Sequence, residues 1–197
     1  MKSEQHQEEQ PIEVFSGLSR LIQHFVFRPG ALLILWGWVM FYSYAMNYLT
    51  QKILMASRTQ SLLGNLGIVL GAVAFIITIF YLLRQAKPVA RQGIYIRYVW
   101  VSLFVSLVLI NLIQYNVLQQ INFELQHPIF MVIIAFAIVV SGSILKYPLL
   151  LAGGIIFGIL AYVASMMSLT DQLLVEAIGW LVAFILPGHI RYLRHKD

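Results

Sequence analysis

The chain has 197 residues, of which 60% are hydrophobic and only 11% are charged, and its mean hydropathy is +0.81. A water-soluble domain of this size could not cover so much apolar surface, so the composition predicts an integral membrane protein. At ~20 apolar residues per spanning helix, the length allows about five to seven spans and no second globular domain. The lack of cysteine excludes disulfides, cysteine-ligated metals and thiol nucleophiles.

The N-terminal segment is first polar and then amphipathic. Its first ten residues contain no apolar run of signal-peptide form, so we expect no cleaved leader. Residues 12–27 alternate apolar and polar side chains at helical spacing. The apolar face comprises Ile12, Phe15, Leu18, Leu21, Ile22, Phe25 and Val26. We therefore assign residues 1–28 to a cytoplasmic tail and an amphipathic helix that lies in the membrane interface.

Residues 29–197 are predicted to form a transmembrane domain with a short basic C-terminal tail. Its apolar runs are each near membrane length. The predicted spans are residues 31–50, 66–83, 98–118, 129–145, 149–168 and 173–190. Pro148 separates the fourth span from the fifth and predicts a tight helical hairpin there. The predicted fold class is all-α, a polytopic transmembrane bundle of six spans.

The basic residues predict the orientation of these spans. Eleven of the 13 Lys and Arg residues fall on the side of the N-terminus, whereas Lys52 and Arg58 fall on the other. The positive-inside rule therefore predicts that both termini are cytoplasmic. The formal charge of +5 is spread over separate inner connections, which favours contact with anionic lipid over nucleic-acid binding.

Several polar side chains fall in the outer half of the predicted spans. Because an unpaired polar group in lipid costs several kcal/mol, we expect them to face the protein interior. The candidate ligand-pocket residues are Asn47, Asn111, Gln114, Tyr115 and Glu176. Two interpretations stay open. In the first, these side chains line an outward-opening pocket. In the second, they form interhelical hydrogen bonds worth roughly 0.6 to 2 kcal/mol each, and Glu176 lies at the interface and touches water. The second is favoured.

Other motifs offer little chemistry. His127 has no second ligand at a metal-site spacing, which favours loop structure over zinc binding. No hydrolase, phosphate-loop or dinucleotide motif occurs, and Ser141 and Ser143 have no activating base on their helix. We therefore expect no metal, no cofactor and no enzymatic activity. The paired glycines at 67 and 71 and at 154 and 158 favour packing within the bundle over dimerisation.

Several motifs together resemble a known family. They are Leu35-Trp36-Gly37-Trp38, Ser141-Gly142-Ser143-Ile144-Leu145-Lys146 and Leu186-Pro187-Gly188-His189. Over most of its length the chain is similar to a family of small, uncharacterised six-span bacterial inner-membrane proteins, which implies that location. Members begin with a short cytoplasmic helix and end in a Pro-Gly-Tyr-like motif, in which His189 here replaces the aromatic residue. Members are often encoded beside a winged-helix regulator, which implies a regulatory role and no specific activity.

These observations lead to two functional hypotheses. The favoured one is a non-enzymatic membrane protein that senses or interacts, through its cytoplasmic helix and basic loops, with a protein partner or anionic lipid. The alternative is a carrier or binding protein for a small polar or lipid-like molecule that occupies the outer-half pocket. If the candidate side chains line a cavity, the carrier hypothesis is favoured. If they are hydrogen-bonded to one another in a packed core, the sensing or interaction hypothesis is favoured.

Overall fold

The computed structural model describes residues 30–53, 57–84 and 91–194. Throughout these ranges the regular structure is helical, so the all-α class is confirmed. The helices are α2 (Ala31–Lys52), α3 (Ser57–Arg84), α4 (Arg91–Leu118), α5 (Phe123–Ile144), α6 (Pro148–Ala164), α7 (Leu169–Trp180), the π-helix η1 (Leu181–Ile185) and α8 (Leu186–Leu193). The predicted amphipathic helix at 12–27 lies outside the described residues.

Five helical stretches are long and apolar enough to cross a membrane. They are Ala31–Lys52, Ser61–Tyr81, Gly93–Leu118, Phe123–Ile144 and Leu169–Leu193, the last of which joins α7, η1 and α8. The remaining helix, α6, is apolar but has only 17 residues. The membrane-protein class predicted from composition is therefore supported, whereas the predicted count of six spans stays a prediction.

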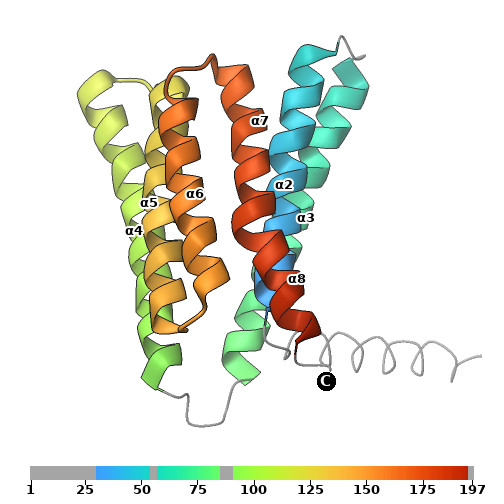
Figure 1. Cartoon of the computed structure of the whole chain (residues 1–197). Helices are drawn as coiled ribbons and strands as arrows, with labels where there is room; N and C mark the ends of the chain where they lie inside the picture. The colour runs from blue at the N-terminus through green and yellow to red at the C-terminus, as the bar shows by residue number, and fades with distance from the viewer. Residues whose placement is uncertain (1–29, 54–56, 85–90, 195–197) are drawn as a thin grey trace, which may run out of the picture.

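The helices run up and down and lie in the order α4, α5, α6, α7, α2, α3 across the molecule (Figure 1). We call the end where α6 joins α7 the α6–α7 end, and the opposite one, where α5 joins α6, the α5–α6 end. The side chains of α3 and α4 are mostly exposed and apolar, so these two helices form the edges. Their exposed surface fits contact with bilayer hydrocarbon.

The core lies where α5, α6 and α7 meet. Its fully buried apolar side chains include Met131, Ile138 and Phe157. The predicted α5–α6 hairpin is confirmed, and Lys146 turns it with a φ of 50°. A Cβ atom at Gly154 would lie 2.9 Å from the backbone nitrogen of Val139, so this glycine lets α6 approach α5 closely. The glycine pair of α6 therefore packs within the bundle, as predicted.

The last helical stretch contains a π-helical turn. Pro187 has no backbone N–H, and just before it the Leu186 N–H donates to the Leu181 carbonyl, a π-helical spacing. The Tyr147 hydroxyl donates to the Pro187 carbonyl at 2.7 Å and thereby connects the hairpin to α8. Burial raises the pKa of Tyr147 by more than the nearby Arg191 lowers it, so the net shift is upward. A tyrosine hydroxyl is protonated at neutral pH at its ordinary pKa and also at a raised one, so it remains a donor.

Four helices begin several residues before the predicted spans: α3 at Ser57 rather than at residue 66, α4 at Arg91 rather than at residue 98, and α5 and α7 as follows. Helix α5 starts at Phe123 rather than at residue 129, because the Asn122 side chain accepts a hydrogen bond from the Leu125 N–H at 3.2 Å and caps the first turn. Helix α7 starts at Leu169 rather than at residue 173. As a consequence His127 lies on a helix, and the interpretation of it as a loop residue is wrong.

Candidate functional site

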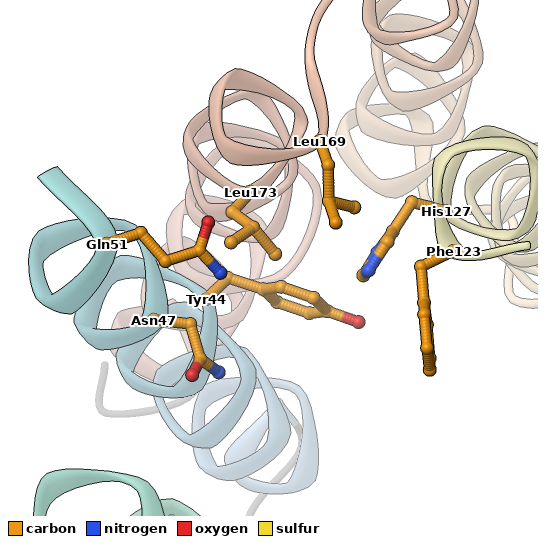
Figure 2. A pocket seen from close by; sticks show the side chains of 7 residues that line it. All are labelled: Tyr44, Asn47, Gln51, Phe123, His127, Leu169 and Leu173. Carbon is orange, nitrogen blue, oxygen red and sulfur yellow. The ribbon is translucent and has the colours of Figure 1, made fainter. Parts of the chain in front are cut away.

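A pocket of about 300 Å³ lies at the α6–α7 end of the bundle. It is formed between α2, the start of α5 and the start of α7 (Figure 2). Its lining residues are Tyr44, Asn47, Gln51, Phe123, His127, Leu169 and Leu173. This volume is at the small end of the range for ligand sites, and the mixture of aromatic, aliphatic and amide groups is typical of such sites.

Helix α2 supplies one wall of the pocket. Tyr44, Asn47 and Gln51 follow one another at helical spacing and therefore share a face. The Asn47 side-chain amide donates to the Ser43 carbonyl at 2.9 Å. The Gln51 side-chain oxygen Oε1 accepts a hydrogen bond from the Thr170 hydroxyl at 2.8 Å, which connects α2 to the first turn of α7. The side chains of this wall are thus held by local hydrogen bonds.

A histidine–glutamate pair lies at the inner side of the pocket. The His127 Nδ1 atom is 2.8 Å from Glu176 Oε2, and the exposed side-chain fractions are 20% for His127 and 0% for Glu176. The second carboxylate oxygen, Glu176 Oε1, is buried and has no hydrogen-bond partner. Tyr44 interacts with Glu176 and meets the His127 ring edge-on, with centroids 5.9 Å apart. His127 therefore connects the pocket to a buried carboxylate.

A proline in α5 helps to place this pair. Pro128 lacks the N–H that would bond to the Glu124 carbonyl one turn earlier. The Gln172 side-chain amide instead donates to that carbonyl at 3.1 Å. Because Gln172 and Glu176 are one turn apart on α7, this bond fixes α7 against α5 at the level where His127 meets Glu176. Pro128 therefore leaves a free carbonyl on α5, and Gln172 uses it to dock α7, the helix that carries Glu176.

The structure separates the five residues predicted to line a pocket. Asn47 lines the pocket, and Glu176 lies behind His127. Asn111 instead accepts a 2.6 Å hydrogen bond from Gln126, and the buried Gln114 accepts one from the Asn122 N–H at 3.2 Å. Tyr115 is 62% exposed and lies apart from the pocket lining. Asn111 and Gln114 on α4 are thus engaged in hydrogen bonds, and of the five residues Asn47 is the one that lines the pocket.

The expectation that Glu176 touches water at the interface is wrong. It rested on a helix that starts at residue 173, which would place Glu176 one turn inside. Because α7 starts at Leu169, Glu176 is about 10 Å from the helix start at ~1.5 Å per residue. Its side chain is fully buried there.

Tyr44, Gln126, His127 and Gln172 are not among the site residues predicted from the sequence. Asn122 is a residue type that often caps a helix, and this could have predicted a helix that begins at Phe123. Such a helix places His127 one turn beyond Phe123, on the same face. Tyr44 precedes Asn47 at i−3 and therefore shares its face. Within the described ranges, no three His, Cys, Asp or Glu residues are grouped so that they could hold a metal ion.

The fold and the site together define a polytopic helical protein of membrane type with a small pocket of mixed apolar and polar lining near one end of its bundle. Comparisons with protein-family models, with curated proteins and with solved structures found no match to this chain. The resemblance based on motifs to a family of bacterial inner-membrane proteins therefore stays a prediction.

Proposed function

We propose that this chain is a non-enzymatic integral membrane protein that binds a small polar molecule in the pocket, as a carrier or as a receptor. The observation that supports this function is the buried Glu176, whose Oε1 atom has no hydrogen-bond partner. A buried carboxylate carries a desolvation cost even when it is paired, as Glu176 is with His127, and ionisable groups inside a membrane domain mark ligand or ion sites by default.

The geometry of the pocket supports binding over catalysis. His127 is the lining residue that could act as a base, and it contacts Glu176 rather than a nucleophile. The lining set contains no serine, threonine, lysine or carboxylate. A ligand can therefore meet aromatic faces and amide groups but no pair of groups that would attack it.

Our proposal for location and orientation is the bacterial inner membrane with both termini in the cytoplasm. The support is the bias of Lys and Arg toward the side of the N-terminus and the similarity of the sequence motifs. In this orientation the pocket opens to the outside. The exposed Lys146 and Arg194 lie at the α5–α6 end, where they would face anionic lipid headgroups.

A sensing or interaction role is the second candidate. Its support is the basic α5–α6 end, where the Arg191 guanidinium lies 5.2 Å from the centre of the Tyr147 ring and Lys146 is exposed nearby. A partner protein or anionic lipid would bind there. The two candidates are compatible, because a receptor can bind a ligand at one end of its bundle and a partner at the other.

Ligand-dependent thermal stabilisation tests the proposed function. The purified protein is screened against small polar and lipid-like compounds, and a bound compound raises the unfolding temperature. Asn47→Trp places an indole in the pocket and should abolish the shift. Tyr115→Trp adds a similar group outside the pocket at an exposed position and should preserve it. A shift that survives Asn47→Trp unchanged would place the ligand elsewhere and reject the proposed site.

A further inference from the structure

We propose that the ligand of the pocket is a small organic cation of the ammonium type, and that it exchanges for the proton that His127 carries opposite Glu176. This inference rests on the proposed function, since it assumes that the pocket binds a ligand. It adds the charge of that ligand and the coupling of its binding to proton release.

The charges of Glu176, His127 and a bound ligand must balance in this buried region. Glu176 is the one ionisable side chain among the buried polar residues of the described chain. An isolated buried carboxylate is strongly disfavoured, whereas an ion pair with a protonated His127 at 2.8 Å is neutral as a whole. A cation that enters the pocket beside His127 makes the total charge positive unless one positive charge leaves. The imidazole can release that charge as a proton.

The proton transfer is balanced by atoms and charge. In the imidazolium form both ring nitrogens carry a hydrogen. His127 Nδ1 keeps its hydrogen and continues to donate to Glu176 Oε2, while Nε2 loses its proton to water. The carboxylate remains ionised and now balances the bound cation. One cation is therefore bound for one proton released, and no other co-reactant is needed.

The pocket lining favours a cation over an anion. Tyr44 and Phe123 present aromatic rings, which attract ammonium groups, and Asn47 contributes an amide whose carbonyl oxygen can accept from them (Figure 2). An anion in the same place would lie close to the buried carboxylate of Glu176 and would be repelled. The small volume restricts the ligand to a compact molecule.

Other charged groups near α7 are accounted for. On α2, Lys52 is half-exposed and forms an ion pair with Asp171 of α7 at 3.1 Å, so the two charges offset each other at the rim. On α5, Glu124 is exposed in the first turn. Helix α6 carries no charged residue, and neither does η1. Tyr44 of α2 is a further titratable group that interacts with Glu176, but it is not basic. His127 is thus the basic group that the buried carboxylate meets.

The test uses choline and its neutral isostere 3,3-dimethyl-1-butanol as probes of the purified protein. Titration calorimetry in two buffers of different ionisation enthalpy reports both affinity and proton release. Choline should bind with release of one proton at low pH, and its affinity should rise about tenfold per pH unit while His127 is still protonated. The neutral isostere should bind more weakly and without a pH dependence.

Variants locate the effect. Glu176→Gln should abolish the preference for choline and the proton release, whereas Glu124→Gln, at an exposed carboxylate of the same end, should leave both intact. His127→Gln provides a second test that does not remove the carboxylate. Because the buried Glu176 then has no cationic partner, its own carboxyl group should carry the exchanged proton, so the pH dependence of choline binding should differ from that of the native protein. An unchanged pH dependence would show that His127 is not the exchanging group.

The two proposals fail in different ways. Equal binding of choline and its isostere, with no proton release, would overturn the cation inference and leave the pocket as a ligand site. Binding of neither probe, while another compound gives a shift that Asn47→Trp abolishes, would also overturn the inference alone. A ligand shift that Asn47→Trp leaves unchanged would reject the proposed function itself.

Discussion

Asn111 and Gln126 show what a polar side chain does inside the bundle when it is not part of the pocket. The Gln126 amide donates to Asn111 Oδ1 at 2.6 Å, and the Asn111 amide donates to the Leu107 carbonyl at 2.9 Å. Both polar groups of Asn111 are therefore used, one within α4 and the other in a bond from α5. Glu176 differs, since one of its oxygens has no partner.

A double-mutant cycle on this pair tests the packing role. Asn111→Leu, Gln126→Leu and the double variant are compared by equilibrium unfolding in detergent. We expect a coupling of about 0.6 to 1.7 kcal/mol, because interhelical hydrogen bonds in membrane bundles have this strength. Ligand stabilisation should be unchanged in all three variants, since neither residue lines the pocket. Additive effects on stability would contradict the hydrogen bond.

At the scale of the helix, glycines decide how closely the elements approach. A Cβ atom at Gly153 would lie 2.9 Å from the Cα atom of Ala183, which is backbone and cannot turn aside. At Gly71 of α3, a Cβ atom would have no neighbour within 4 Å. The same substitution should therefore have opposite effects at these two positions.

Replacement of each glycine by alanine gives a matched pair of variants. Gly153→Ala should destabilise the protein by about 1 to 3 kcal/mol, because α6 must move away from η1. Gly71→Ala should be neutral or stabilising by up to about 1 kcal/mol, because alanine favours a helix. Thermal unfolding measures both. A destabilised Gly71→Ala variant would indicate that the open face of α3 packs against something, such as a second copy of the chain.

The sequence predicted the helices of this protein well but placed some of their first residues incorrectly. Apolar runs correctly located six helices and the α5–α6 hairpin, because membrane helices are long and uniformly apolar. The starts of α5 and α7 contain polar residues such as Glu124 and Asp171, so hydropathy placed both starts too late. That error moved His127 into a loop and Glu176 to the surface, and it hid the pair they form. No pattern along the chain reports that contact between helices.

At the scale of the whole molecule, orientation is the property that the basic residues predict. Single cysteines can report it cleanly, because the chain contains none of its own. Gln120 and Lys146 are exposed in connections at opposite ends of the bundle. A membrane-impermeant thiol reagent should label Gln120→Cys in intact cells and Lys146→Cys only after permeabilisation. The reverse pattern would place the pocket on the cytoplasmic side.

The charge selectivity of the pocket tests most directly whether a cation site lies beside Glu176. Asn47→Cys is modified with two thiosulfonate reagents of similar size, one carrying a trimethylammonium group and one carrying a sulfonate, and the ratio of the two rates is measured. Gln120→Cys, which is exposed outside the pocket, supplies the reference ratio. We predict that the cationic reagent is favoured more strongly at residue 47 than at residue 120, and that Glu176→Gln removes this difference. Equal ratios at the two positions would contradict a cation site beside Glu176.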